Sequence, residues 1–514
     1  MIKVEQGKAL APVIAGTTVA LYLSYKIFLS LLHKKNKYTK EIPVPGSSYP
    51  YIGHMSSLGD MPAATISQWH KELGPIIQFR MGVQTWVSID SPELAHKVMV
   101  TNGSKASHRN ENEFAYKLYS FGGKGIVHSQ PNAAWKKARA AVTAAIAPSQ
   151  IELHMASIQK QAKKLVDTLM ETSKKTKAGS FPFKDLQLYV MNTVTLIAYG
   201  KTFPTKDDPK FIEISETIDD GFKLSGVDYD LANYLPIFAI YDYFKGARNI
   251  LKRFLKERRD PLFRGLINDA YHTDGPNLVK YLKENGYDLS EEETMVIFSD
   301  LTSAGTDTNS VYLCWTIAIM CRHPEVQLKI AAEIDDFVKR NGRLPLFSER
   351  LELPFCISAM KECMRYKPIT AFGIPHMAID DIEVDGYIIP KGATIISNMM
   401  SMHQNSEFYT DRPNEYVPER FLEALETSSA SSKGKVEDRD HFNFGWGRRI
   451  CPAIHMAEVE TFVGFVELMS RCFIEPGEDG MPNIDIAENG GISILPSPYK
   501  VKFTDRSLID PTQN

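Results

Sequence analysis

Cysteine is scarce in this chain and is absent from its first half. Six of the 514 residues are cysteines, the first is Cys314, and no two form a Cys-x-x-Cys pair. This usage excludes the disulfide framework of a secreted protein and fits a reducing compartment. Cys314 and Cys321 lie in an apolar helical stretch, so we expect both to be core residues.

An excess of charge of one sign is missing as well. The chain has 59 Lys and Arg against 62 Asp and Glu, a net charge of −3, so its composition indicates no nucleic-acid partner. There is also no internal repeat and no linker in the middle of the chain. We therefore expect residues 41–514 to form a single domain that is large enough to bury a prosthetic group.

Long apolar runs are absent, with one exception at the N-terminus. Residues Ala9–Leu32 are largely apolar and contain one charge, Lys26, and about 20 apolar residues suffice to span a bilayer as a helix. A basic run over 33–40 follows, which places the rest of the chain on the cytosolic side. We predict an N-terminal transmembrane helix with a basic flank in residues 1–40. The alternative, a cleaved signal peptide, is disfavoured by Lys26 and this flank.

The remaining pattern predicts a mainly α fold with a small β subdomain. Residues 134–340 are mostly helical in pattern, whereas strand patterns are short and scattered. The predicted strands are Pro75–Met81 and Thr85–Asp90 around Gly82, strands within Ile374–Ile396, and short strands in Ile492–Phe503.

One cysteine stands in a loop whose neighbours suit a haem iron. The sequence Phe444-x-x-Gly447-x-Arg449-x-Cys451-x-Ala453 offers a soft thiolate, Cys451, that would push electron density onto iron. Phe444 could shield the sulfur, Gly447 permits a tight turn, and the permanent charge of Arg449 could pair with a haem carboxylate. Ala453 is small enough for a helix to pass close by. A buried structural cysteine would need none of these neighbours.

A long helix is predicted upstream of the cysteine loop. Ser290 and Glu293 form a capping box, and the helix can run to Arg322, where Pro324 ends it. At about 1.5 Å per residue it would be about 50 Å long. Its centre, 304–309, reads Ala-Gly-Thr-Asp-Thr-Asn, which disfavours a helix locally.

The polar residues in this centre suit proton delivery to oxygen. Thr308 could hydrogen-bond to bound dioxygen, and Asp307 could relay protons through water, so we predict both as catalytic. Gly305 could let the helix open locally. The alternative is a kinked core helix whose polar groups are satisfied internally.

Taken together, these motifs resemble those of the cytochrome P-450 superfamily of haem-thiolate monooxygenases, eukaryotic microsomal class. The cysteine loop and the Ala/Gly-Gly-x-Asp/Glu-Thr pattern both match, although Ala453 replaces the commoner Gly and Asn309 a commoner Thr or Ser. The resemblance implies a cytochrome P-450-like haem-thiolate fold and one cofactor, haem b (iron protoporphyrin IX), bound through Cys451.

The resemblance also implies roles for residues outside the two motifs. Glu362, Arg365 and Arg420 would form a buried structural charge network. The haem carboxylates would be bound by Arg449 together with Trp135, Arg139 and His376. Taken alone, Trp135 and Arg139 could be an ordinary amphipathic pair, and His376 a loop histidine.

The implied substrate pocket is apolar and aromatic, which fits a steroid, terpenoid, fatty acid or xenobiotic. Our preference is a steroid-like or other flat lipophile. The pocket residues predicted by family position are Phe114, Phe121, Ala304, Phe372, Ile374 and Ile492.

The chain lacks a flavin or nicotinamide fingerprint, since Gly122–Gly125 has no strand–turn–helix context. Electrons would therefore come from NADPH through a partner, NADPH-cytochrome reductase, docked near Lys136, Lys137 and Arg448; cytochrome b5 is a second candidate donor. The resemblance places the enzyme on the endoplasmic reticulum membrane, facing the cytosol, with O2 and a small lipophile as substrates.

Two other functions are compatible with a haem-thiolate protein. An isomerase, dehydratase or peroxygenase needs no proton delivery to O2 and often lacks an acid–alcohol pair such as Asp307 and Thr308. A non-catalytic haem-binding protein would need neither this pair nor an electron donor.

Overall fold

The computed structural model describes residues 40–46 and 48–508. The predicted anchor, Ala9–Leu32, lies outside them. Within the described part of the chain, no helix has both the length and the apolar character needed to span a bilayer. The division into an anchor and one domain over 41–514 stays a prediction.

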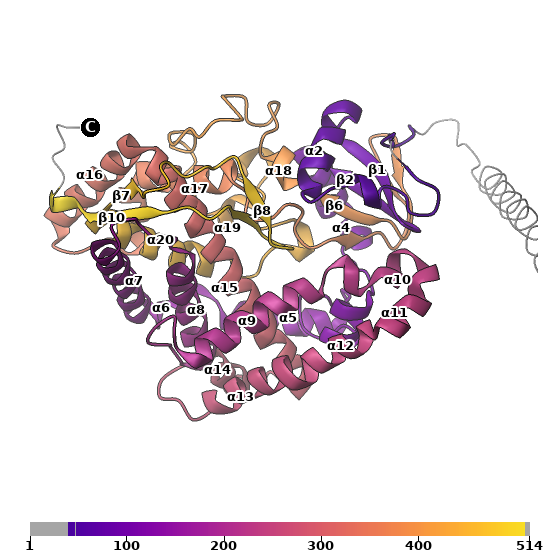
Figure 1. The fold of residues 1–514 in the computed structure, drawn as a ribbon, viewed down its shortest axis with the longest axis horizontal. Coiled ribbons are helices and arrows are strands. Elements are labelled where there is room, and N and C mark those ends of the chain that lie inside the picture. Colours follow the sequence, from indigo (N-terminus) through magenta and orange to yellow (C-terminus); the bar gives the residue numbers. More distant parts are fainter. Residues whose placement is uncertain (1–39, 47, 509–514) are drawn as a thin grey trace, which may run out of the picture. The chain divides into compact units, whose positions relative to one another are not determined.

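The fold is mainly helical, as predicted (Figure 1). The helices of the first half are α2 (Pro62–Leu73), α3 (Pro92–His96), α4 (Gly103–Ala106), α5 (Ala133–Ala145), α6 (Pro148–Glu152), α7 (Met155–Lys175), α8 (Phe183–Tyr199), α9 (Pro209–Leu224), α10 (Leu231–Tyr234), α11 (Ala239–Lys245) and α12 (Ala247–Phe254). Those of the second half are α13 (Asp260–Ala270), α14 (Leu278–Glu284), α15 (Glu291–Arg322), α16 (Pro324–Asn341), α17 (Pro354–Tyr366), α18 (Met399–Met402), α19 (Ser428–Ser431) and α20 (Ile454–Arg471).

Short 3-10 and π-helical turns also matter for the site. Three are π-helical and one is a 3-10 turn: η2 (Lys97–Thr101), η3 (Glu113–Tyr119), η6 (Leu255–Arg259) and η9 (Gly447–Arg449).

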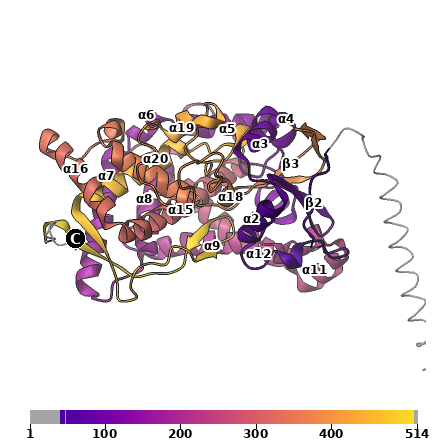
Figure 2. The ribbon, with the colours of Figure 1, turned by 90° about the horizontal axis from the view of Figure 1, so that it is seen from above.

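The strands form small sheets, the largest with the order β1-β2-β6-β3. Its hairpin closes around Gly82, where Met81 pairs with Gln84, and β2 then runs parallel to β6. The predicted strand region 374–396 is broken into four short strands, with a turn at Asp385–Gly386. In two orthogonal views this sheet and the helices α7 and α16 lie at opposite ends of the fold (Figure 1; Figure 2). The strands are β1 (Ile76–Met81), β2 (Gln84–Ile89), β3 (His376–Met377), β4 (Ile382–Val384), β5 (Tyr387–Ile389), β6 (Thr394–Ser397), β7 (Cys472–Pro476), β8 (Ala487–Asn489), β9 (Ile494–Pro496) and β10 (Val501–Asp505).

Helix boundaries follow local signals. The side chains of Asn132 and Asp208 accept hydrogen bonds from the first backbone amides of α5 and α9, which would otherwise lack partners. Ser290 and Glu293 form the predicted capping box at the start of α15. Helix α8 ends at Gly200 in the left-handed conformation.

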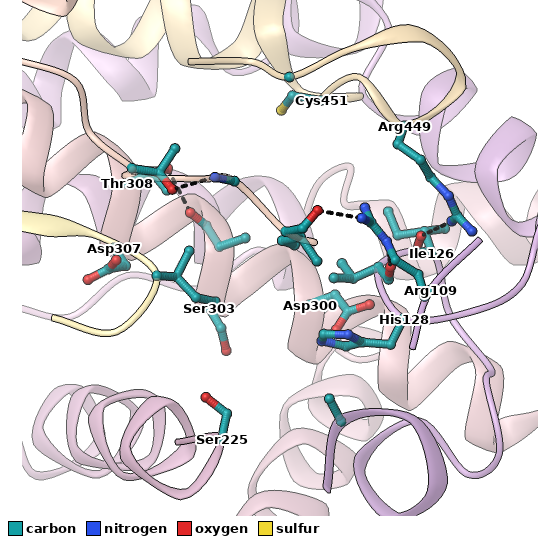
Figure 3. A pocket seen from close by; sticks show the side chains of 18 of the residues that line it. Arg109, Ile126, His128, Ser225, Asp300, Ser303, Asp307, Thr308, Arg449 and Cys451 are labelled. Atoms are coloured by element: carbon teal, nitrogen blue, oxygen red, sulfur yellow. Dashed lines mark hydrogen bonds between the residues drawn. The ribbon is translucent and has the colours of Figure 1, made fainter. Parts of the chain in front are cut away.

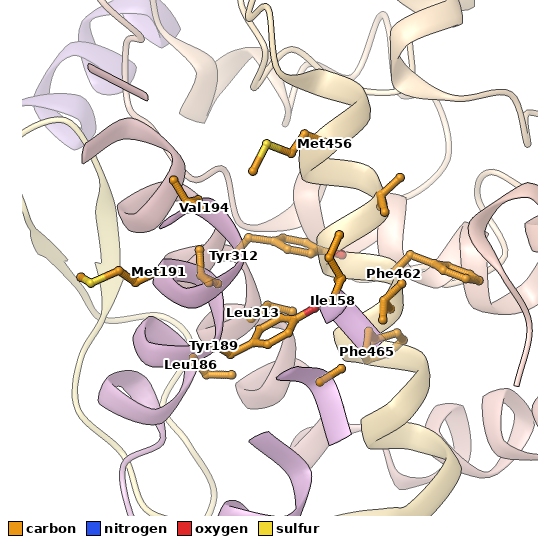
Figure 4. Close-up of a cluster of buried hydrophobic side chains, with 14 of the residues drawn as sticks. Ile158, Leu186, Tyr189, Met191, Val194, Tyr312, Leu313, Met456, Phe462 and Phe465 are labelled. Atoms are coloured by element: carbon orange, nitrogen blue, oxygen red, sulfur yellow. The ribbon is translucent and has the colours of Figure 1, made fainter. Parts of the chain in front are cut away.

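Helix α15 passes through the main core and packs against α8 and α20. Figure 4 shows Tyr189, Tyr312 and Phe462 filling this region. At Gly305 a Cβ atom would lie 3.1 Å from Val194 of α8. The expected local opening at Gly305 is not found, since α-helical structure runs through it without a break. The glycine instead lets two buried helices approach closely.

Candidate active site

A cavity of about 330 Å³ lies between the centre of α15, the chain around η3, the loop before β3 and the cysteine loop. Figure 3 shows Cys451 at one end of this cavity, Arg449 and Arg109 along one side, and Asp307 with Thr308 along the other. Ser225 lies at the end remote from Cys451. Elements from most of the chain length thus meet around one space.

The cysteine loop presents the Cys451 sulfur to the cavity. The Cys451 backbone N–H donates to the Phe444 carbonyl at 2.9 Å, and both residues line the cavity. Gly447 has a φ of +52°, and a Cβ there would lie 2.3 Å from the Met99 carbonyl oxygen. The turn therefore requires glycine. Burial raises the pKa of the Cys451 thiol, whereas a hydrogen bond from the Ala453 backbone and the charge of Arg139 lower it.

Three arginines, Arg109, Arg139 and Arg449, line the same cavity. Their side chains donate to backbone carbonyls; Arg449, for example, donates to Ser107 at 2.8 Å and to Ser129 at 2.5 Å. No carboxylate of the described residues lies within 4.0 Å of any of the three. This cluster of guanidinium groups is therefore stabilised by carbonyl dipoles but not by counter-charges.

The electrostatics of this wall follow from the missing counter-charges. Burial and the repulsion from Arg449 and Arg139 lower the pKa of Arg109 well below its usual range, and burial lowers the pKa of Arg449 to about 10. The nearby His376 and His128 have pKa values lowered to about 3, chiefly by burial, and are neutral. A dianionic group would relieve this repulsion. The two carboxylates of a haem b whose iron meets the Cys451 sulfur fit this requirement.

Trp135 and His376 differ in how they face the cavity. His376 lines it, and its Nδ1 atom bonds to the Ala106 carbonyl at 2.7 Å. Trp135 is not among the lining residues; its indole N–H donates to the Ile126 carbonyl at 3.1 Å. The Arg449 guanidinium carbon lies 4.5 Å from the Trp135 ring centroid. Trp135 therefore orients a cavity arginine in this structure.

The polar residues of α15 point to the cavity along one helix face. The Thr308 hydroxyl donates to the Ala304 carbonyl at 2.8 Å, and the Asp307 carboxylate accepts from the Ser493 hydroxyl. Burial raises the pKa of Asp307 to about 6 although the Ser493 bond opposes the shift. Asp307 can therefore gain and lose a proton near neutral pH.

Of the six predicted pocket residues, Phe121 does not line the cavity, so this prediction is corrected. Its backbone φ is +47°, shortly after the π-helical turn η3, and its ring packs against the core with its centroid 5.4 Å from the Arg259 guanidinium carbon. Tyr119 lines the cavity in its place. The five that do line it are Phe114, Ala304, Phe372, Ile374 and Ile492.

Sequence reasoning missed several polar lining residues, among them Arg109, His128, Arg259 and Asp300. None belongs to a recognisable motif, and charged residues are ordinarily predicted at the surface. The one usable signal is Asp300, a charged residue in an otherwise apolar stretch of the long helix.

Comparison with known proteins identifies the family. The family described as Cytochrome P450 matches residues 43–503. This chain belongs to the cytochrome P450 family. Relatives over most of its length are cytochrome P450 monooxygenases, and the chain is an enzyme of this class.

The relatives of this cytochrome P450 differ in what they are named for. A cytochrome P450 monooxygenase CYP3 of Mycosarcoma maydis is 26% identical over 98% of this chain and 95% of its own. A trans-cinnamate 4-monooxygenase of Catharanthus roseus is 26% identical over 87% of this chain and 89% of its own. A steroid 17-alpha-hydroxylase/17,20 lyase of Felis catus is also 26% identical, over 91% and 93%.

Solved structures agree on the fold. A zebra fish cytochrome P450 determined with progesterone superposes with a TM-score of 0.70, covers 87% of this chain and 99% of its own, and is 23% identical. This similarity establishes the P450 fold for the described chain and leaves the substrate open.

Away from the cavity, the P450 contains a closed network of buried charges. Glu362 and Arg365 form two hydrogen bonds of 2.7 Å each, and Arg420 donates to Glu362 at 3.0 Å. Arg365 also donates to the carbonyls of His403, Pro413 and Glu415. These three residues are thus together in space, with their charges paired.

Proposed function

We propose that this P450 binds haem b with Cys451 as the thiolate ligand and inserts one atom of O2 into an apolar substrate. The observation that carries this proposal is that the buried sulfur and the three unpaired guanidinium groups of Arg109, Arg139 and Arg449 line one cavity. When bound, the haem supplies the oxygen-activating chemistry, and the chain supplies its ligand and surroundings.

The residues of the cavity then take distinct roles. Arg109, Arg139 and Arg449 hold the haem carboxylates, with His376 beside them. Thr308 would present its hydroxyl to O2 in the cavity, and Asp307, whose pKa is raised to about 6, would take up protons from solvent and pass them inward. Phe444 keeps water from the sulfur.

The apolar lining supports a lipophilic substrate, a steroid, terpenoid, fatty acid or xenobiotic, with a flat molecule preferred. Phe114, Phe372, Ile374 and Ile492 are among the apolar residues of this lining. Relatives of equal similarity are named for a steroid and for cinnamate, so the names favour no single substrate.

Electrons would come from NADPH through NADPH-cytochrome reductase, with cytochrome b5 as a second donor. The exposed Lys136 and Arg448 lie in segments next to the cavity's arginine wall and suit an acidic partner. A location on the endoplasmic reticulum membrane is supported by exposed apolar residues around α11: Ile237 and Ile240 are 71% and 70% exposed, and Tyr243 and Phe244 81% each. A patch of this kind favours contact with lipid.

The proposal is tested by reducing the purified protein under carbon monoxide and recording the Soret band. We expect a strongly red-shifted band that Cys451→Ala abolishes. Cys472→Ala is the matched control, because Cys472 is buried outside the cavity, and it should keep the band. A band at the ordinary position in the unmodified protein would overturn thiolate ligation.

Oxygen insertion is separated from the alternatives by Thr308→Ala. With reductase, NADPH and O2 present, this variant should form less product and more peroxide, by about tenfold or more if proton delivery is lost. Thr306→Ala is the control, since Thr306 is buried but does not line the cavity. Absence of product from the unmodified protein, with no change in product or peroxide on substitution, would favour a non-catalytic haem protein, and turnover without NADPH a peroxygenase or isomerase.

A further inference from the structure

Polar side chains gather at the part of the cavity remote from the sulfur. Arg259, from η6, and Asp300, from α15, both line the cavity and are only 1% and 6% exposed. Figure 3 shows Asp300 between the level of Thr308 and the far end marked by Ser225. Most of the lining is apolar, so these two charged groups need a reason to be there.

Arg259 has hydrogen-bonding capacity to spare. Its Nη1 atom donates to the Tyr119 carbonyl at 3.0 Å, and Nε lies 2.6 Å from an Asp260 carboxylate oxygen. Nη2 has no hydrogen-bond partner among the described residues. The guanidinium carbon lies 4.5 Å from the Tyr119 ring centroid, so the aromatic ring holds the group in place from one side.

Asp300, like Arg259, has a polar atom without a hydrogen-bond partner among the described residues. Its Oδ2 atom is buried and has no hydrogen-bond partner among the described residues. Burial raises the pKa of Asp300 to about 7, whereas the Tyr119 hydroxyl, the charge of Arg259 and the backbone N–H groups of Ile126 and Val127 lower it. The carboxylate and the Arg259 guanidinium make no ion pair within 4.0 Å, so neither group satisfies the other. Buried polar atoms without partners are rare in folded proteins and mark binding sites when they face a cavity.

The chemistry of the missing partner follows from these two atoms. A hydroxyl group can accept from a guanidinium N–H such as Arg259 Nη2 and can donate to a carboxylate oxygen such as Asp300 Oδ2. A hydrocarbon satisfies neither of them. A carboxylate would meet the charges of Asp260 and Asp300 together with a guanidinium that already has an acid beside it. The arrangement therefore selects a neutral oxygen that can donate and accept.

We propose that Arg259 and Asp300 form a subsite for a hydroxyl group at one end of an otherwise apolar substrate. Asp300 precedes Thr308 by two turns of α15, a separation of about 12 Å along the helix. The substrate is thus held by its alcohol at one end and oxidised at a carbon about that far away. This inference rests on the proposed function, since it takes the cavity for the substrate pocket.

The test uses imidazoles whose ring nitrogen binds the haem iron and whose chain extends into the pocket. The purified haem-loaded protein is titrated with 1-alkylimidazoles from hexyl to dodecyl, and with the same chains ending in a hydroxyl or in a carboxylate. The Soret shift reports binding. At the chain length that reaches the subsite, the hydroxyl probe should bind about tenfold more tightly than the alkyl probe, and the carboxylate probe no more tightly than the alkyl probe.

Variants then assign the preference to the two residues. In Arg259→Met and Asp300→Val, the hydroxyl advantage should fall to less than about twofold. Arg253→Gln, an exposed arginine on the preceding helix, should keep it. Equal binding of alkyl and hydroxyl probes at every length in the unmodified protein overturns the subsite, and that comparison needs no variant to fold.

The outcomes also separate this inference from the proposed function. If no probe gives the spectrum of an imidazole-bound haem and the carbon monoxide band is not red-shifted, the haem-thiolate function itself fails. If the alkyl probes bind with that spectrum and only the hydroxyl preference is missing, the function stands and the subsite alone is wrong.

Discussion

The molecule contains two clusters of charged residues in its interior, which differ in whether the arginines have a carboxylate partner. In the first, the Glu362 carboxylate contacts both Arg365 and Arg420 at 2.7 to 3.0 Å, and backbone carbonyls accept from the remaining N–H groups of Arg365. In the second, Arg109, Arg139 and Arg449 share a wall with no carboxylate of the described residues within 4.0 Å. We call them the closed cluster and the open cluster.

The difference between the closed and the open cluster indicates where a ligand would bind. Burying a charge is costly unless it is paired, so a folded protein that leaves three cations unpaired at one cavity is complementary to an anion that is not part of the chain. The closed cluster needs nothing more and can only stabilise the fold. The presence of a carboxylate partner, rather than the number of charged residues, distinguishes the two roles.

The largest expected effect is on the closed cluster. Glu362→Ala would leave Arg365, which is 1% exposed, without its counter-charge, and should lower the free energy of unfolding by about 3–5 kcal/mol. Urea unfolding followed by circular dichroism measures it. If Glu362→Ala unfolds at the same urea concentration as the unmodified chain, the cluster does not stabilise the fold.

The open cluster should respond in the opposite way. Arg109→Met removes a buried unpaired charge, so the haem-free chain should be as stable as before or more stable, while haem retention falls by about 10- to 100-fold because a charged hydrogen bond is lost. Haem transfer to excess apomyoglobin measures retention. Arg343→Met is the control, since Arg343 is exposed and paired with Glu349. Loss of stability without loss of haem would contradict the comparison.

One buried acidic residue is intermediate in character between the two clusters. Glu460 is fully buried and accepts from the Asn309 amide at 2.5 Å, and burial raises its pKa from 4.5 to about 8. The folded chain therefore keeps a proton that the unfolded chain releases above pH 4.5. The contribution of this proton to the free energy of unfolding is complete below pH 4.5 and is lost progressively as the pH rises to about 8.

Glu460→Gln should remove this dependence. Between about pH 6 and about pH 7, the unmodified chain should lose about 1.4 kcal/mol of stability relative to the variant. Thermal unfolding across this range gives the difference, and Glu284→Gln, at an exposed position, should show none. Parallel pH profiles for Glu460→Gln and the unmodified chain would mean that Glu460 is ionised in the fold.

The smallest effect is expected at the surface next to the closed cluster. Lys329 and Glu419 form an ion pair of 3.1 Å with side chains 58% and 46% exposed. Lys329→Ala should change the free energy of unfolding by no more than about 1 kcal/mol, because water screens such a pair. A larger loss in the same urea experiment would show that this pair belongs energetically to the buried network.

The sequence predicted the parts of this molecule that local chemistry determines. The capping box at Ser290, the hairpin around Gly82 and the predominance of helix follow from side chains a few residues apart. The cysteine loop was predictable because its spacing is itself a motif. Local signals could not reveal that Phe121 is not a lining residue of the cavity, since tertiary packing decides which side chains face it.

The polar residues of the cavity were hidden for a different reason. Arg109 and Arg259 look like surface residues in a single sequence, because nothing in their neighbourhood indicates burial. Their importance depends on what lies across the cavity, which the tertiary fold decides. The role of Asn309 was equally hidden in the sequence: its amide donates to a buried acid, Glu460, about 150 residues later in the chain.

The contact between Gly447 and Met99 sets an order of events during synthesis. The two residues are about 350 positions apart, yet Gly447 packs so closely against Met99 that a Cβ atom there would lie 2.3 Å from the Met99 carbonyl oxygen. Contacts this distant in sequence form late, after the intervening chain has closed its loop. The turn that positions the Cys451 sulfur can therefore form only after the chain as far as this turn has left the ribosome.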